Sequence, residues 1–186
     1  MQLQPFTVAA AAQISAWATS RDEVFKWCSR TEAPAPAAII VAWSEPADVA
    51  SYVLVDDDGA LVAYGELWID DDEHEVELAR LIVAPWLRGR GIGRRFVTML
   101  TEEARRHHRF VALRVHPDNE PAQRCYAAAG FERATASEEG EWNRGQPVGF
   151  VWMVRRPEPA GNPQPADVRA SRSCGTSGRG TRRSPP

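Results

Sequence analysis

The sequence predicts an α/β domain of the α+β kind, with a mixed and mostly antiparallel central sheet of about six to seven strands. Residues 49–69 form a hairpin pattern, in which two β-rich runs flank the turn Asp56-Asp57-Asp58-Gly59. A strand–loop–helix pattern follows at residues 73–107, and another strand and helix follow at 110–129. Strands mixed with helices in this way are typical of a sheet that carries helices packed against it.

Length and charge indicate one folded domain and a tail of different character. The 186 residues are enough for one domain with a sizeable core. Residues 157–186 carry five arginines against Glu158 and Asp167, a net +3, so residues 1–156 account for −6 of the formal total of −3. We therefore expect a single acidic domain over residues 1–156, which argues against general nucleic-acid binding. Residues 157–186, rich in proline, glycine and arginine, are expected to be disordered.

Other features bear on location and metals. No apolar run approaches the ~18 residues that a membrane span needs. The N-terminus has no basic segment ahead of an apolar one, so it lacks the pattern of a secretion signal. Cys28, Cys125 and Cys174 are scattered, and no pair has the spacing of metal ligands. We therefore expect a reduced cytoplasmic protein without a metal, a disulfide or a membrane span.

The N-terminal elements are the least regular ones. Residues 3–8 predict a short strand, and residues 9–17 predict a helix by propensity. A second helix is expected to begin at Ser20, which can cap a first turn that is acidic. Residues 31–48 contain three prolines, so we expect irregular chain there, with a brief strand at 39–41.

The later elements follow from hydrophobic periodicity and from glycine and proline stops. We expect strands at 52–55, 61–69, 73–83, 110–115, 131–133 and 148–154, and helices at 92–107 and 120–129. The first of these helices buries a stripe that runs through Phe96 and Leu100. Residues 137–147 are expected to be a polar loop.

A glycine-rich basic segment joins the strand that ends at Val83 to the following helix. Gly89, Gly91 and Gly93 let the backbone approach a ligand and turn its N–H groups inward. The helix N-terminus and the neighbouring arginines add positive charge. The segment lacks the Lys-Ser/Thr pair of a P-loop, and Gly93 comes one position too early for a dinucleotide fingerprint. A phosphate site of another type is predicted.

Two motifs in the chain resemble those of the GNAT superfamily of N-acetyltransferases, which take acetyl-CoA. The first is Arg88-x-x-Gly91-x-Gly93, which resembles the superfamily's pyrophosphate-binding motif. The second is a strand that ends at an Asn, followed by a helix with an Ala and a Tyr before a Gly-Phe pair. Its residues stand at intervals of three, four, four and one: Asn119, Ala122, Tyr126, Gly130 and Phe131. Together the two motifs span roughly residues 66–133.

The resemblance implies helices on both faces of the sheet and an acyl-CoA cleft where the strand before the glycine loop splays from its parallel neighbour at 111–115. A bulge near Arg80 to Ile82 would aim one N–H at the thioester oxygen. The backbone at 81–83 would pair with the pantetheine arm, to which Asn119 would also bond. The implied acetyl-CoA-binding residues are Leu81, Ile82, Val83, Arg88, Gly89, Arg90, Gly91, Ile92, Gly93, Arg94, Asn119, Ala122 and Tyr126.

Two residues are predicted to be catalytic. Tyr126 is the family's usual proton donor to the leaving thiolate. Glu77 is the candidate base for the amine, directly or through water, because several family members carry a catalytic glutamate six residues before the position of Val83. Strand alternation puts Glu77 on the same face as Leu81 and Val83 unless a bulge intervenes. Glu66 and a chain of waters are the alternatives to Glu77.

These features predict an N-acetyltransferase that moves an acetyl group from acetyl-CoA to a primary amine, of a small molecule or of a peptide or protein, by direct attack in a ternary complex. The alternative is a catalytically silent acyl-CoA-binding or protein-interaction module. Cys125 as an acetylated nucleophile is the rival mechanism, but it points about 100° away from Tyr126 on the helix. The acidic run Asp70–Glu77 is a further candidate for attracting an amine.

The acceptor pocket and the oligomeric state are predicted only in outline. Residues that could line an acceptor pocket are Trp17, Trp27, Trp68 and Trp142. Some members of the superfamily dimerise, so a homodimer is compatible with the resemblance. The sequence identifies neither the amine nor a dimer seam.

Overall fold

The computed structural model describes residues 1–157, and most of the predicted tail, residues 158–186, lies outside the described residues. Seven strands form one sheet in the order β1-β2-β3-β4-β5-β7-β6. They are β1 (Gln2–Pro5), β2 (Val49–Val55), β3 (Leu61–Asp70), β4 (Glu75–Val83), β5 (Phe110–Val115), β6 (Glu132–Arg133) and β7 (Val151–Arg155). Of the neighbouring pairs, β4 and β5 are parallel and the others are antiparallel. The predicted mixed, mostly antiparallel sheet is confirmed.

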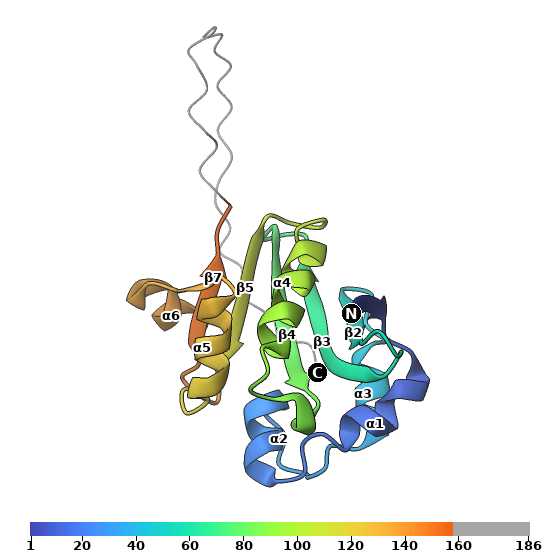
Figure 1. Ribbon diagram of the computed structural model, residues 1–186. Helices are drawn as coiled ribbons and strands as arrows, with labels where there is room; N and C mark the ends of the chain where they lie inside the picture. Colours follow the sequence, from blue (N-terminus) through green and yellow to red (C-terminus); the bar gives the residue numbers. More distant parts are fainter. Residues whose placement is uncertain (158–186) are drawn as a thin grey trace, which may run out of the picture.

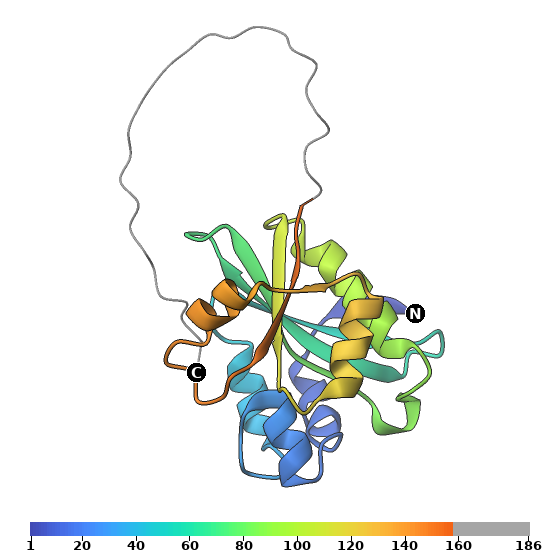
Figure 2. The same ribbon diagram turned by 90° about the vertical axis from the view of Figure 1, so that its left-hand side faces the viewer.

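Helices cover both faces of this sheet (Figures 1 and 2). They are η1 (Val8–Ala10), α1 (Ala11–Ser15), α2 (Arg21–Cys28), α3 (Ala37–Trp43), η2 (Pro85–Leu87), α4 (Ile92–Ala104), α5 (Glu120–Ala128) and α6 (Ala136–Trp142). One core cluster packs Phe96 and Leu100 of α4 against Leu78 and Leu113. A second cluster packs α1 to α3 against the other face, around Ile82. Burial of apolar side chains on both faces therefore holds the sheet in the middle of the domain.

Several predicted elements are confirmed by the structure. The helix expected from Ser20 is α2, and the Ser20 side chain accepts a hydrogen bond from the Glu23 N–H in a capping box. The strand predicted at 110–115 is β5. The helix predicted at 92–107 is α4, which ends earlier, at Ala104. Capping residues and strong periodicity are local signals, so the sequence is sufficient to read them.

Two predictions near the chain's irregular segments are wrong, and a third is confirmed in part. The strand expected at 39–41 is part of helix α3, in which Ile40 and Trp43 are buried against the core. Spacing by three places both on one helix face, and packing outweighs the strand preference of β-branched residues. The polar loop expected at 137–147 contains α6, which begins with a capping box between Thr135 and Glu138. The helix expected over residues 9–17 is shorter, because it starts as the 3-10 turn η1 and ends at Ser15.

Within residues 1–157, none of the helices combines the length and the apolar character that crossing a membrane requires.

Candidate active site

A bulge interrupts β4 at the position that the sequence predicted. Glu66 of β3 pairs with Ala79, and Tyr64 pairs with Ile82, so Gly65 alone faces the two residues between them. The first of the two, Arg80, has a φ of 49°. The extra residue resets the alternation of side chains along β4, which decides where every later residue of the strand points.

The two parallel strands separate just before this bulge. β4 pairs with β5 from Glu75 to Leu78, opposite Phe110 to Leu113, and the pairing stops there. On its other edge, β5 pairs with β7 from Val111 to Val115. The remainder of β4, up to Val83, therefore lacks a neighbour on its β5 side. The predicted splay is confirmed, and it opens the sheet toward the cavity.

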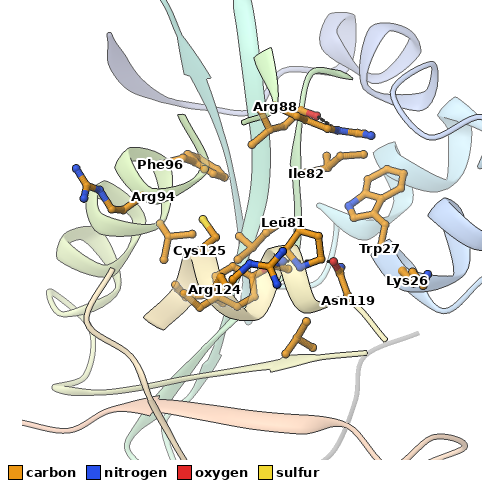
Figure 3. Close-up of a pocket in the computed structure, with 18 of the residues that line it drawn as sticks. Lys26, Trp27, Leu81, Ile82, Arg88, Arg94, Phe96, Asn119, Arg124 and Cys125 are labelled. Carbon is orange, nitrogen blue, oxygen red and sulfur yellow. Dashed lines mark hydrogen bonds between the residues drawn. The ribbon is translucent and has the colours of Figure 1, made fainter. Parts of the chain in front are cut away.

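A cavity of about 920 Å³ occupies the splay and is lined by α2, β4, the glycine loop, α4, β5 and α5. Arg94 and Phe96 from α4 lie on one side, and Lys26 and Trp27 from α2 lie on the other (Figure 3). Leu81 of β4 lies between them. The volume lies at the upper end of the range for small-molecule and cofactor sites.

The glycine loop forms one end of this cavity. Gly89 and Gly91 have φ values of 75° and 80°, which favour glycine over other residues. Gly91 is the N-cap of α4 and supplies no side chain to cap the first turn, whose N–H groups therefore remain available to an anion. A Cβ at Gly93 would lie 3.0 Å from Cys125 Sγ, so glycine lets α4 approach α5 closely. Arg90 and Arg94 line the cavity beside these N–H groups. Such a loop has the geometry of an anion site, and its binding of pyrophosphate stays a prediction.

Arg88 has contacts that the sequence did not predict. Its guanidinium donates to Glu23 Oε1 at 2.7 Å, to the Trp17 carbonyl at 2.9 Å and to the Val83 carbonyl at 3.1 Å. In Figure 3 this side chain turns toward the side of the cavity formed by α2. The Arg88 side chain therefore ties α2 to the end of β4, and its part in binding pyrophosphate stays a prediction.

The second motif forms the opposite wall of the cavity from α5. Asn119 caps the helix by accepting from the Ala122 N–H, and Ala122 and Tyr126 line the cavity. Burial raises the pKa of Tyr126, and the neighbouring Cys125 contributes in the same direction. The phenol therefore keeps its proton at neutral pH.

Burial also raises the pKa of Cys125, although Arg94 opposes the shift. A thiol without a populated thiolate is a poor nucleophile, so the geometry and the protonation state both disfavour the covalent rival mechanism.

The candidate base Glu77 does not share a face with Leu81 and Val83, and the expectation that it would is wrong. Val76 and Leu78, on either side of Glu77, belong to the core cluster under α4, against which Leu81 and Val83 also pack. Because the bulge adds a residue between them, Glu77 points to the other face of the sheet. There its Oε1 lies 3.1 Å from Arg114 Nε, with the Glu77 side chain 13% exposed. Glu77 is thus an ion-paired carboxylate behind the cavity wall.

The alternative base Glu66 is also fully engaged. It is 0% exposed and accepts hydrogen bonds from the Tyr64 hydroxyl at 2.7 Å, Trp68 Nε1 at 2.7 Å and Arg80 Nη1 at 2.9 Å. Burial raises the pKa of Glu66, whereas Arg80 and the two other donors lower it. A buried carboxylate that already accepts three hydrogen bonds is poorly placed to take a proton from a substrate. Its contacts instead hold the neighbouring side chains in place.

A row of alternating aromatic and arginine side chains crosses the sheet on the face opposite α4. The guanidinium of Arg80 lies 4.1 Å from the ring centre of Trp43 and 4.9 Å from that of Trp68. Arg114 continues the row at 5.3 Å from Trp68 and 5.6 Å from Trp152. The sequence did not predict this row, because the side chains of Arg80, Arg114, Trp43 and Trp152 come from four elements and no local motif connects them.

The four tryptophans proposed for an acceptor pocket do not converge on one pocket. Trp27 lines the cavity and stacks edge-on with Trp43. Trp68 lies in the aromatic–arginine row, and Trp142 packs against Trp152, the last residue of that row. Trp17 is buried separately and contacts Trp86.

The acidic run at 70–77 lies at the end of β4 that is remote from the glycine loop. Asp70 Oδ1 accepts from the N–H groups of Asp72 and Glu73, as in an ordinary polar turn. Asp71 contacts His108. Of the described residues that line the cavity, Glu23 is the one carboxylate, so the acidic run does not form an acceptor pocket. No group of three or more potential metal ligands occurs within residues 1–157.

A family model agrees with this geometry. Residues 11–131 match the model of the acetyltransferase (GNAT) family. No curated protein matches the chain at a significant level.

Solved structures with the same fold include two acetyltransferases. One is AAC(6')-Ib in complex with ribostamycin and coenzyme A, at 21% identity and a TM-score of 0.63, with 83% of this chain and 92% of that chain covered. Another is spermidine N-acetyltransferase from Vibrio cholerae in complex with CoA and spermine, at 14% identity and a TM-score of 0.63, covering 82% and 92%. At these identities the likeness concerns the fold.

Proposed function

This chain belongs to the acetyltransferase (GNAT) family, so it is an acetyl-CoA-dependent acyltransferase, and we propose that it acetylates a primary amine by direct attack in a ternary complex. The observation that carries the proposal is the cavity in the splay between β4 and β5, which has the glycine loop at one end and Tyr126 on its wall. Acetyl-CoA supplies the activated acetyl thioester.

The chain's own residues divide the binding of acetyl-CoA between them. The loop Gly89–Arg94 and the N-terminus of α4 hold the pyrophosphate through N–H groups and two arginines. The backbone of Leu81–Val83 pairs with the pantetheine arm in place of a β5 neighbour. Asn119 and Ala122 contact that arm from α5. Tyr126 donates a proton to the leaving sulfur from its position on the cavity wall, and its raised pKa keeps the phenol protonated until then.

Whether a carboxylate near the cavity can act as a base affects which amines are acetylated. Glu77 is paired with Arg114, Glu66 with Arg80, and Glu23 with Arg88. Of these three, Glu23 alone lines the cavity, and Arg88 lowers its pKa, whereas Glu66 and Glu77 lie outside the lining. Neutralising an amine of pKa ~10.4 at pH 7 costs about 4.6 kcal/mol, whereas an α-amine of pKa ~7.8 costs about 1 kcal/mol. The acceptor we favour therefore carries an α-amine or another amine of low pKa, on a small molecule or at a peptide N-terminus, and loses its proton to water.

The neighbours' acceptors are of another kind. The two solved structures hold ribostamycin and spermine, and such polycations are usually held by acidic groups. The lining of this cavity holds more arginine than carboxylate. We therefore rank polycations below simple α-amines as acceptors.

The test uses a matched pair of amines. Lysine blocked at its α-amine and lysine blocked at its ε-amine present the same atoms with amines of different pKa. We expect acetyl-CoA-dependent release of CoA to be at least about tenfold faster, as kcat/KM at pH 7, with the free α-amine. The rate should rise with pH until that amine has lost its proton. Equal rates with both amines would contradict the preference. Acetyl-CoA binding without release of CoA with any amine would favour the silent module.

A further inference from the structure

We propose that Glu66 and Trp27 are positioning residues, which hold the β4 bulge in the conformation that acetyl transfer needs. The inference rests on the proposed function, since it assigns to these two residues the support of the backbone that faces the acetyl group. Neither side chain has to touch the reacting atoms for this role.

The backbone at Arg80 is in a conformation that its residue type disfavours. Its φ of 49° lies in the left-handed region, where a Cβ crowds the following carbonyl. Ser29 and His74 are the other non-glycine residues with positive φ in the described chain, and they stand at the end of α2 and in the β3–β4 turn. Arg80 is thus the one such residue inside a strand among residues 1–157. A strained residue persists where its surroundings hold it in place.

The backbone carbonyl and the guanidinium of Arg80 are both held by other elements. Its carbonyl accepts a hydrogen bond of 2.7 Å from Trp27 Nε1 of α2. Its guanidinium donates to Glu66 Oε2 at 2.9 Å and is stacked between Trp43 of α3 and Trp68 of β3. Because α2, α3 and β3 all contribute, the bulge is fixed from three directions.

The Glu66 carboxylate is in turn held by hydrogen bonds from other side chains besides Arg80. The remaining contacts of its carboxylate are the Tyr64 hydroxyl and Trp68 Nε1, both at 2.7 Å. Four groups therefore form one buried network, in which removing the charge of Glu66 weakens the hold on Arg80. Glu66 does not line the cavity, so its effect on the reaction must pass through the bulge.

The bulge controls the part of β4 that faces the cavity. Leu81 and Ile82, the next residues, line the cavity close to Trp27 (Figure 3). Leu81 also packs closely over Gly65, where an added Cβ would lie 2.5 Å from its Cδ2. A rotation of the backbone at Arg80 would turn the N–H groups of both residues and move Leu81. Alignment of an N–H with the acetyl carbonyl depends on this rotation being prevented.

The first test compares Glu66→Gln with the wild-type chain. Glutamine keeps the size of the side chain but removes the charge that holds Arg80. We expect kcat to fall about tenfold, because a misaligned oxyanion donor raises the barrier, while KM for acetyl-CoA changes less than about twofold. Trp27→Phe keeps an aromatic side chain but loses the indole N–H, and its kcat should fall in the same direction. Glu103→Gln, which alters a contact with Tyr52, is the control and should retain full activity.

The second test asks whether the backbone conformation is the cause. Glycine adopts a φ near +49° freely, whereas alanine does not. In the Glu66→Gln background, Arg80→Gly should therefore turn over at least about fivefold faster than Arg80→Ala. Equal turnover by the two double variants would overturn the proposal.

Amide hydrogen exchange separates this inference from the proposed function. In Glu66→Gln, the N–H groups of Leu81 and Ile82 should exchange at least about tenfold faster, while those of Val76 to Leu78 keep their wild-type rates. Unchanged exchange rates at Leu81 and Ile82 would overturn the proposal that Glu66 fixes the bulge, whatever the activity of the variant. A wild-type chain that exchanges as expected but releases no CoA with any amine would instead overturn the proposed function, and the catalytic part of this inference with it.

Discussion

Tyr126 and Cys125 are neighbours on α5, and burial keeps both of them protonated at neutral pH. Loss of hydration raises the pKa of each group, because the charged form is the one that loses solvation. For Tyr126 this preserves a proton that can be donated to a leaving thiolate. For Cys125 it removes the thiolate that a covalent mechanism would need. One physical cause thus keeps the first residue protonated and disfavours the second as the nucleophile.

Replacing Tyr126 by Phe tests the assigned acid. The change removes the hydroxyl and leaves the ring in place, so turnover should fall about 10- to 100-fold, in line with the usual contribution of a general acid. The affinity for acetyl-CoA should change less than about twofold. Steady-state release of CoA and calorimetric binding measure the two quantities. Tyr52→Phe, at the Glu103 contact, serves as the control, and unchanged turnover in Tyr126→Phe would remove the role.

At the scale of elements, α2 connects the two halves of the site. Arg88 of the glycine loop ties the start of the helix through Glu23, and Trp27 ties its end to the β4 bulge. The Arg88 guanidinium beside Glu23 lowers the pKa of that carboxyl, although its burial acts in the opposite direction. The other oxygen of Glu23 accepts from the N–H groups of Thr19 and Ser20. The glycine loop and helix α2, which both line the cavity, therefore form one connected unit.

Two arginine variants separate the cofactor end of this unit from the acceptor end. Arg94 is exposed at the start of α4 and lines the cavity, so Arg94→Ala should raise KM for acetyl-CoA about three- to tenfold, with little effect on KM for the amine. Arg88→Ala releases α2 and should raise KM for the amine more than KM for acetyl-CoA. Two-substrate kinetics at fixed ionic strength measure both constants. If both variants changed the two KM values in the same way, the role of Arg88 in positioning α2 would be contradicted.

At the scale of the whole molecule, ion pairs close the C-terminal side of the domain. Arg156, just after β7, lies 2.7 Å from Glu138 of α6. Arg133 of β6 pairs with Glu139 at 2.9 Å, and Glu139 also accepts from the Trp152 N–H. Hydrogen bonds from Arg156 and from the Thr135 backbone and hydroxyl lower the pKa of Glu138 to about 2. These contacts join the last helix to the last strands of the sheet.

The depressed pKa predicts a pH dependence of stability. A carboxyl whose folded pKa is about 2, against an ordinary value of 4.5, contributes stability above pH 4.5 and loses it as pH falls toward 2. Glu138→Gln should therefore lower the free energy of unfolding by about 1 kcal/mol at pH 7, and the difference should vanish near pH 2. Urea unfolding at pH 7, 4 and 2.5 measures this. Glu141→Gln on the same helix is the control, and a difference that stays constant with pH would contradict the assignment.

The agreement between sequence and structure follows the locality of the signals. The strand, glycine loop and helix at 75–104 are contiguous, and their propensities, glycines and periodicity all lie within a few residues of each other. Helix α3 was missed because the burial of Ile40 and Trp43 against distant elements decides it. The Glu77 prediction depended on side-chain alternation along β4, and the confirmed bulge reversed it.

The sequence by itself determined the family and the strand, glycine loop and helix, and through the resemblance it implied the splayed sheet, because each rests on short runs whose chemistry and spacing are local. Only the tertiary structure decided how the charged side chains are paired. Arg80 with Glu66, Arg114 with Glu77 and Arg88 with Glu23 join residues 14, 37 and 65 positions apart. Such pairs depend on strand register and on one bulge, so no local sequence pattern predicts them. Because of these pairs, the carboxylates considered as bases instead stabilise the structure around the site.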